Sequence, residues 1–353
     1  MNEKVLTTTG FYGTGSSAIT DLIREYDNVC CKDENEIRFL HDPDGISDLE
    51  YNIIENPNRH NSSHSIKRFM KQMKMLDHVG PIKRYNKYFN GCFWPAIEEF
   101  YRSIVQFEYA SVWHYDVYDR GVFFYIISRV YSNINAIMHK IFKVPIDGQA
   151  LVPKSEHAMV PISNEKEFLK AVNILTSHIV DCLNEHNCEF VLLDQFVPPS
   201  NIDRYTRYVN GIKVVVLDRD PRDIYLLEKC VWNGTIAPTD DIVKFCEWYR
   251  WTREIYYKRI QSNSALNVKF EDLIYNYEET VENIEKFFGL SRNQHLKPRQ
   301  YFNPDISIKN TQLWKVYTDY KEDIEYIENH LREYCYAFPE NCHFERRKND
   351  VLF

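Results

Sequence analysis

The sequence predicts one α/β domain, a three-layer sandwich in which helices cover both faces of a central parallel sheet. Three observations support this prediction. Short apolar runs alternate with stretches of helical periodicity along most of the chain. The runs at 189–193 and 213–217 are partly β-branched, as strands buried on both faces of a parallel sheet usually are. No repeat or linker divides the 353 residues, so we expect residues 1–353 to form a single domain.

The elements follow in order from the hydrophobic pattern. The first is a strand at 5–9, followed by a glycine-rich turn and a helix over about 16–26 with Ala18 and Leu22 on its apolar face. The later elements alternate: a helix at 165–185, strands at 189–193 and 213–217, a helix after Arg222, a helix at 240–260, a strand at 265–270, a helix at 278–288 that ends at Gly289, and a helix at 319–334.

The region between the first helix and residue 150 has a different composition. The stretch from Asn56 to Ser65 is rich in His, Asn and Ser, which indicates an exposed loop. Aromatic and apolar residues recur at helical spacing over 93–144, which predicts helices packed over the sheet. We therefore expect residues 41–150 to form a helical, substrate-facing insertion within the domain.

Composition narrows the classes of function. The 43 Lys and Arg residues against 51 Asp and Glu residues give a net charge of −8, which argues against a chain that coats nucleic acid or an anionic membrane, although a local basic patch is still allowed. The 9 cysteines lack CxxC or Cys/His zinc spacing, so we expect reduced thiols and no metal site. No apolar run approaches the roughly 18 residues of a membrane helix and no signal peptide is visible, so we expect a cytoplasmic protein.

The turn after the first predicted strand, Gly10-Phe11-Tyr12-Gly13-Thr14-Gly15-Ser16-Ser17, is the first candidate site. Gly10 and Gly15 have the spacing of the P-loop pattern, which predicts a fold like that of the P-loop nucleotide kinases, but Ser16 stands where that pattern has Lys. The turn still offers backbone N–H groups and the hydroxyls of Thr14, Ser16 and Ser17 to an anion. The alternative is a β–α turn that binds nothing.

The second candidate is the run Arg219-Asp220-Pro221-Arg222-Asp223, which directly follows the predicted strand 213–217. Pro221 is suited to begin a helix. Ligands of parallel sheets bind at the carboxyl ends of the strands, and an Arg there can grip a phosphate with two hydrogen bonds. The alternative is a surface network of Arg and Asp.

These two segments resemble the nucleotide-binding motifs of the PAPS-dependent sulfotransferases, whose donor is 3′-phosphoadenosine-5′-phosphosulfate (PAPS). Further segments agree, and together they extend from residue 5 to about 315. Val268–Leu273 and Phe287–Leu290 are similar to that family's "YEDL" and "FLGL" runs, Ile308–Lys315 is similar to its late basic loop, and Glu36-Ile37-Arg38-Phe39-Leu40 resembles the "KEVHFF" segment of the heparan sulfate sulfotransferases.

The resemblance implies a role for each matching residue. The 5′-phosphosulfate would be held by the loop residues Gly13, Thr14, Gly15, Ser16 and Ser17, and the 3′-phosphate by Arg219, Lys309, Asn310 and Lys315. Glu36 would take the proton from the acceptor hydroxyl as a general base. The implied acceptor is a carbohydrate, such as a glycan precursor, and aromatic side chains suited to stack on sugar rings are Trp94, Trp113, Tyr115 and Tyr118.

Three positions depart from the family. Gly13 and Gln195 stand where relatives have cations, and Leu227 stands where they have Ser. The missing charge weakens stabilisation of the leaving group, so we expect other cations, with Lys83, Arg84 and Lys87 as candidates near the acceptor. Two other functions stay open: a P-loop kinase or another nucleoside-triphosphate enzyme, and a nucleotide-binding module without catalysis.

Overall fold

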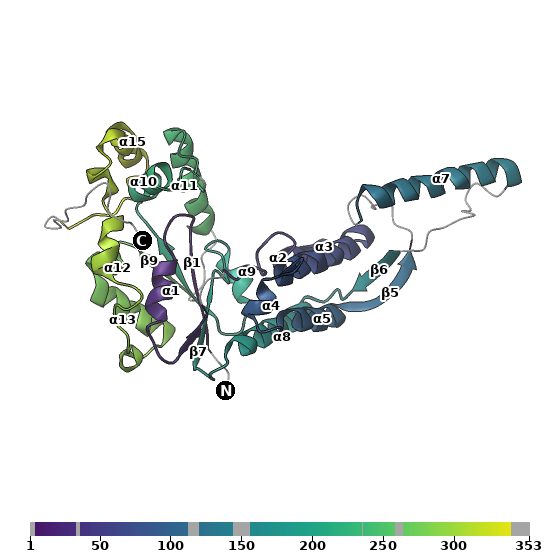
Figure 1. Ribbon diagram of the computed structural model, residues 1–353, viewed down its shortest axis with the longest axis horizontal. Coiled ribbons are helices and arrows are strands. Elements are labelled where there is room, and N and C mark those ends of the chain that lie inside the picture. Colours follow the sequence, from purple (N-terminus) through teal and green to yellow (C-terminus); the bar gives the residue numbers. More distant parts are fainter. Residues whose placement is uncertain are drawn as a thin grey trace. The chain divides into compact units, whose positions relative to one another are not determined.

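The computed structural model describes residues 4–32, 36–111, 120–143, 156–234, 236–257 and 264–339. The chain divides into two compact units, one made of Met1–Leu40 and Val180–Phe353 and the other of His41–Ile179. Figure 1 shows the helices and strands of both units. The first unit contains the glycine-rich turn and the Arg219 motif.

The first unit is built on a five-stranded parallel sheet in the order β2-β7-β1-β8-β9. The central strand β1 (Lys4–Gly10) pairs with β7 (Phe190–Asp194) on one side and with β8 (Lys213–Asp218) on the other. The edges are β2 (Val29–Cys31) and β9 (Ala265–Lys269). The four longer strands confirm the four predicted from the sequence. The central strands β1, β7 and β8 are buried on both faces over most of their length, whereas only Val268 of the edge strand β9 is buried.

Helices flank this sheet in the predicted three-layer α/β arrangement (Figure 1). Apolar residues of α1 (Ser17–Ile23) and α13 (Tyr277–Phe288) form one core with the strands. A second apolar cluster joins α10 (Pro221–Cys230), α11 (Ile242–Tyr257) and α15 (Lys321–His330). The remaining helices of the unit are α9 (Ile202–Thr206), α12 (Asp272–Tyr275), α14 (Pro304–Ser307) and the short 3-10 turns Arg292–Gln294, Ile308–Asn310, Leu313–Lys315 and Thr318–Tyr320.

The second unit is mainly helical, with two small antiparallel sheets. Its helices are α2 (Ile46–Glu50), the π-helical turn Tyr51–Glu55, α3 (Arg59–Asp77), α4 (Tyr85–Tyr88), α5 (Phe93–Ile104), α7 (Val122–Phe142) and α8 (Glu165–Leu183), whose last residues belong to the first unit. The strands are β3 (His78–Val79), β4 (Ile82–Lys83), β5 (Val105–Ser111) and β6 (Glu156–Pro161).

The expectation of an exposed loop from Asn56 to Ser65 is wrong, because most of this stretch forms the first turns of the long helix α3. Asn58 caps the helix, and its side-chain oxygen accepts hydrogen bonds from the N–H groups of His60 and Asn61. Ser62, Ser63 and Ser65 are buried. The small serines permit close packing, and Ser63 Oγ accepts from the N–H of Met159 at 3.1 Å.

The helices expected over 93–144 are present as α5 and α7, but both belong to the second unit and not to the layers over the five-stranded sheet. The expectation also missed strand β5. This strand pairs in antiparallel fashion with β6, far along the chain. No described helix is long and apolar enough to cross a membrane. The cysteines that the structure describes are free thiols.

Candidate nucleotide site

The glycine-rich turn lies between β1 and α1, at the carboxyl end of the central strand. Gly13 and Gly15 have φ angles of 79° and 78°, which residues with a side chain rarely adopt. Gly10 is required for space, because a Cβ there would overlap Thr14 Oγ1. A Cβ on Gly13 would lie 3.2 Å from Ile224 Cγ2. The three glycines therefore fix the backbone of the turn, and a side chain at position 13 would have little room beside Ile224.

Several donors of the turn are not used within the protein. In the described part of the chain, the N–H groups of Gly13, Gly15 and Ser16 make no hydrogen bond. Thr14 is different, because its N–H and its hydroxyl both donate to the Phe11 carbonyl, at 3.1 and 2.7 Å. The Thr14 side chain is fully buried and closes the turn. The donors that can face an anion are therefore mainly backbone groups.

Ser16 is connected to the neighbouring strand by Gln195, the residue after β7. Gln195 Nε2 donates to Ser16 Oγ at 2.8 Å, and Gln195 Oε1 accepts from Thr9 Oγ1 at 2.9 Å. Because Ser16 Oγ is the acceptor in this hydrogen bond, the hydroxyl proton of Ser16 can be donated to a ligand. Ser17 is exposed at the start of α1 and adds a second hydroxyl. Gln195 thus orients a neutral hydroxyl donor at the turn.

Glu36 lies at the same end of the sheet as the turn. The N–H of its neighbour Ile37 donates to the carbonyl of Asp194, the last residue of β7, at 2.9 Å. Ile37 and Phe39 are buried, so the chain alternates and leaves Glu36 and Arg38 exposed. Glu36 Oε2 accepts from Arg38 Nη1 at 2.9 Å, and the side chain of Glu36 is 51% exposed. A carboxylate that solvent and a substrate can reach therefore stands beside β7.

Asp194 is not among the residues that the motifs predict. Its Oδ1 accepts from Thr8 Oγ1 at 3.0 Å and from Thr20 Oγ1 at 3.4 Å. Burial raises the pKa of Asp194 to about 6, and the charge of Glu36 adds to this effect. An acidic residue at the end of an apolar strand is the sequence signal that points to it. The site therefore contains two nearby carboxyl groups, one exposed and one largely buried.

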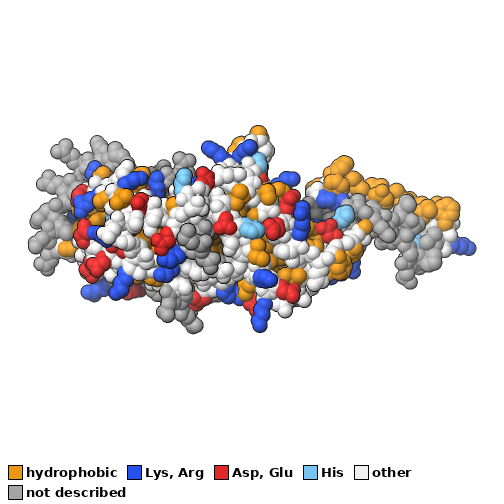
Figure 2. All heavy atoms as spheres, turned by 90° about the horizontal axis from the view of Figure 1, so that it is seen from below, with side chains coloured by type: hydrophobic (Ala, Val, Ile, Leu, Met, Phe, Trp, Pro, Cys, Tyr) orange, Lys and Arg blue, Asp and Glu red, His pale blue; other side chains and the backbone are white. Residues whose placement is uncertain are grey.

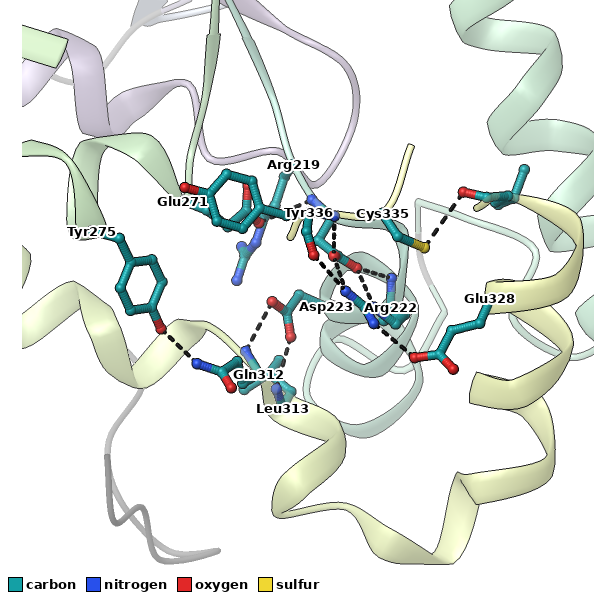
Figure 3. A network of polar contacts seen from close by, with 12 residues as sticks. Arg219, Arg222, Asp223, Glu271, Tyr275, Gln312, Leu313, Glu328, Cys335 and Tyr336 are labelled. Atoms are coloured by element: carbon teal, nitrogen blue, oxygen red, sulfur yellow. Dashed lines mark hydrogen bonds and ion pairs between the residues drawn. The ribbon is translucent and has the colours of Figure 1, made fainter. Parts of the chain in front are cut away.

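Arg219 follows β8 and is buried (Figure 3). Its guanidinium lies 4.5 Å from the ring centre of Phe270, and Nη2 donates to the carbonyl oxygen of Asn310. Asn310 is also buried, and its Oδ1 has no hydrogen-bond partner among the described residues. The structure therefore brings together two residues that the sequence resemblance assigns to the same phosphate.

Asp223 anchors the segment 308–315 beside Arg219 (Figure 3). Its carboxylate accepts from the N–H of Gln312 at 3.0 Å and from the N–H of Leu313 at 2.8 Å. Within this segment Lys309 is half-buried and Lys315 is exposed. The anchored segment thus carries two lysines next to the buried arginine.

Buried carboxyl groups surround Arg219. Arg222 Nη2 contacts Asp220 Oδ2 at 2.6 Å. Glu271 Oε1 accepts from the N–H of Asp220 at 3.0 Å, and Glu271 Oε2 has no partner among the described residues. Burial raises the pKa of Asp223 and of Glu271, and the charge of Asp220 raises both further, whereas Arg219 acts in the opposite direction. Protonation of Asp223 and Glu271 lowers the negative charge around the arginine.

A second buried ion cluster lies at the ends of β8 and β9. Asp218 accepts from Arg253 Nη2 at 2.8 Å and from Lys269 Nζ at 2.9 Å. Burial alone would raise the pKa of Asp218, but the two cations hold it below its ordinary value. Arg253 is fully buried, with its guanidinium 4.3 Å from the ring centre of Phe11 in the turn. The Lys269 side chain is 31% exposed. The sequence analysis gave neither cation a role, although Lys269 lies in the segment Val268–Leu273 that resembles a family motif.

The expected acceptor residues belong to the second unit. Lys83 is the exposed last residue of β4, and Lys87 is exposed in α4. Arg84 donates from Nη1 to the Met75 carbonyl at 3.3 Å. Trp94 is the second residue of α5 and donates from Nε1 to a Glu98 oxygen at 2.9 Å. The other expected sugar-stacking residues, Trp113, Tyr115 and Tyr118, lie outside the described residues.

Two other features of the described chain bear on ligands. A cavity of about 500 Å³ lies beside β9 and α13, with Lys213 and Lys286 in its wall, but the residues of the turn and Arg219 do not line it. Among the residues with described placement, no group of three or more His, Cys, Asp or Glu side chains could hold a metal ion.

Comparisons of the chain with protein families, curated proteins and solved structures found one weak structural similarity to report. No protein-family profile matches the chain, and no curated protein matches it. Among solved structures, it is similar to the sulfotransferase STF1 from Mycobacterium tuberculosis H37Rv, with 11% identity, 88% of this chain and 76% of that chain covered, and a TM-score of 0.33. A similarity at this TM-score does not assign a function to the chain. The proposal below is therefore based on the residues of the site.

Proposed function

We propose that the chain is a sulfotransferase that moves a sulfuryl group from PAPS to a hydroxyl group of a carbohydrate. The observation that carries the proposal is that the two candidate anion-binding segments follow adjacent strands. The turn follows β1 and Arg219 follows β8, and Gly10 of β1 pairs with Leu217 of β8. A donor that carries phosphate at both its 5′ and its 3′ position requires two such segments.

The turn fits the 5′-phosphosulfate. The N–H groups of Gly13, Gly15 and Ser16 are not used within the described chain, and backbone N–H groups in such a turn form a concave anion site. Ser16 and Ser17 add hydroxyl donors, and Gln195 orients the first of them. Thr14 contributes to the shape of the turn rather than through its hydroxyl.

The Arg219 region fits the 3′-phosphate. A guanidinium matches the geometry of a phosphate with two parallel N–H bonds. Lys309, Asn310 and Lys315 come from the segment that Asp223 anchors beside Arg219. The raised pKa values of Asp223 and Glu271 favour their neutral forms, which reduces repulsion of a phosphate.

The charge absent at Gly13 and Gln195 has a candidate replacement in the first unit. Lys269 ends β9, and the ring of its neighbour Phe270 lies 3.6 Å from the position of a Cβ on Gly15. Its side chain is partly exposed. We propose that Lys269 stabilises the bridging oxygen as the sulfuryl group leaves. Lys83, Arg84 and Lys87 then remain candidates for binding the acceptor.

Glu36 supplies the base in this proposal. The acceptor oxygen attacks sulfur in line, a new O–S bond forms, and the bond between sulfur and the bridging phosphate oxygen breaks. The electron pair leaves with adenosine 3′,5′-bisphosphate, and the acceptor proton moves to the Glu36 carboxylate. Exposure of Glu36 at the end of β7 supports this role, because an acceptor sugar can reach it.

Calorimetric titration of the whole chain with adenosine 3′,5′-bisphosphate, AMP and ATP tests the donor. We expect the bisphosphate to bind more tightly than the other two, and Arg219→Gln to remove most of its advantage over AMP. Lys286→Gln, in the wall of the separate cavity, is the matched control. Tight ATP binding with no preference for the 3′-phosphate would contradict the proposal that PAPS is the donor.

Transfer of labelled sulfate from PAPS to a panel of glycans tests the reaction. Binding of the bisphosphate without any transfer would favour a nucleotide-binding module instead. Transfer to small alcohols but not to glycans would reject the carbohydrate acceptor and keep the donor.

One observation favours a second candidate, a nucleoside-triphosphate enzyme. Asp194 ends the strand next to β1, where triphosphate enzymes with a P-loop place the carboxylate that helps to bind Mg²⁺. Ser17 occupies the Ser or Thr position of the same pattern. This candidate requires Mg²⁺-dependent ATP binding that Asp194→Asn weakens, which the same titrations measure.

A further inference from the structure

Helix α7 of the second unit exposes a continuous apolar face. It is a helix of 21 residues, and one row of its apolar side chains, spaced at three and four positions, lies on one side. The exposed members are Phe123 (70%), Ile126 (55%), Val130 (50%), Ile134 (37%), Ile137 (55%) and Ile141 (65%). Further exposed apolar residues near its ends, among them Val122 and Phe142, lie outside this row. Figure 2 shows hydrophobic side chains gathered over this helix. So large an apolar face on a surface helix indicates a binding surface.

The described part of the protein does not cover this face. Asn135 is the one residue of α7 that is buried, and no described helix or strand packs extensively along the helix. Asn135 lies on the side of the helix away from Val130 and Ile137, as its spacing from them requires. The apolar face therefore needs an occupant from outside the described chain.

The charges of α7 have one sign. The helix contains Arg129, His139 and Lys140 and no Asp or Glu, and Arg120 and Lys143 flank it. The whole chain has a net charge of −8, so this helix is a local exception. Arg129 follows Ile126, and Lys140 follows Ile137, by three positions, which puts both cations at the border of the apolar face. The occupant should be apolar at its centre and anionic at its rim.

We propose that α7 binds an anionic lipid surface and lies in the plane of the interface, with its apolar face among the acyl chains and its cations at the level of the phosphates. A second copy of the helix fits less well, because it would bring the same cations together without a carboxylate on either helix to pair with them. The helix does not cross the bilayer, since none of the described helices is suited to do so.

Co-sedimentation of the full chain with vesicles tests the proposal. We expect binding to vesicles of phosphatidylcholine and phosphatidylglycerol, and at least about tenfold weaker binding to phosphatidylcholine alone, because several cations lie near the lipid phosphates. Ile137→Asp should lower the partition coefficient at least about tenfold. Leu296→Asp is the matched control, because Leu296 is equally exposed in the first unit, at 61% against 55% for Ile137.

A second variant keeps the apolar face intact. Arg129→Gln with Lys140→Gln should remove most of the preference for anionic vesicles and leave the thermal unfolding of the chain unchanged. Three results would overturn the proposal: no binding to either kind of vesicle, equal losses in Ile137→Asp and Leu296→Asp, or a dimer in light scattering that Ile137→Asp converts to a monomer. The last result assigns the face to a second copy.

Discussion

Gln195 Nε2 donates to Ser16 Oγ at 2.8 Å and so connects the end of β7 with the turn after β1. This bond decides in which direction the Ser16 proton points. In Gln195→Glu the carboxylate still accepts from Thr9 but also draws the Ser16 proton to itself, and it adds negative charge. We expect the affinity for adenosine 3′,5′-bisphosphate, measured by calorimetry, to fall at least about tenfold.

Gln195→Ala is the neutral comparison for this change. It removes the carboxamide without adding charge, so the loss of affinity should be smaller, about two- to tenfold. The φ angle of 56° at this position is equally unusual for all three residues, so backbone strain is matched. Unchanged affinity in Gln195→Glu would show that Ser16 does not donate to the ligand.

Gly10→Ala tests the packing of the turn. The added methyl group overlaps Thr14 Oγ1 and lies 3.0 Å from the Leu217 carbonyl oxygen, so we expect the free energy of unfolding in urea to fall by about 2 kcal/mol or more. Thr14→Ala removes the overlapped oxygen and its bond to Phe11, at a loss of about 1 kcal/mol. The double variant should lose less than the sum of the two. Simple additivity would mean that the overlap is not the cause.

Asp194→Asn should change how stability depends on pH. The pKa of Asp194 rises from 3.8 to about 6 in the folded chain, so folding favours the protonated carboxyl. This contribution of Asp194 to the free energy of unfolding is fully present below pH 3.8 and is lost as the pH rises through about 6. We therefore expect Asp194→Asn to raise the free energy of unfolding by about 2 kcal/mol near pH 8 and to have little effect near pH 4. Asp181→Asn, at an exposed position of α8, is the control, and an equal gain at both pH values would contradict the assignment.

Glu36→Gln separates proton transfer from donor binding. The amide cannot accept the acceptor proton, so kcat for transfer from PAPS should fall by about two to four orders of magnitude, whereas the affinity for adenosine 3′,5′-bisphosphate should stay within about twofold. Arg38→Gln removes the ion partner of Glu36 and should shift the pH profile of kcat while keeping activity. Full transfer by Glu36→Gln would exclude it as the base.

The sheet of the first unit could be predicted because its strands are short apolar runs with turn residues at both ends. Gly289 also marked the end of α13 correctly, since it adopts the left-handed cap conformation with φ of 82°. The second unit was harder. The serines of α3 have the composition of a loop, and they are helical because β6, more than ninety positions along the chain, packs against them. Strand β5 likewise depends on a distant partner.

The candidate site shows the same division. The turn and Arg219 stand out because each is a contiguous motif directly after an apolar run. Asp194 and Lys269 carry no predicted role, and the parallel order of the strands brings both to the carboxyl end of the sheet. Arg253 comes from α11 and reaches this end through its ion pair with Asp218. Leu227 occupies a motif position in the sequence, but its side chain is buried in the apolar cluster of α10 and α11 and does not take part in the candidate site.

The order of strands in the first unit also constrains how the chain folds. Strand β1 is synthesised before the second unit, yet both of its neighbours, β7 and β8, come after the whole of His41–Ile179. During synthesis β1 therefore has no partner strand, and the apolar residues of β1 and α1 stay exposed until the second unit has been made. Closure of so long a loop before any pairing slows folding. Until β7 and β8 are made, the apolar residues of β1 and α1 therefore offer a target to chaperones that bind short apolar segments.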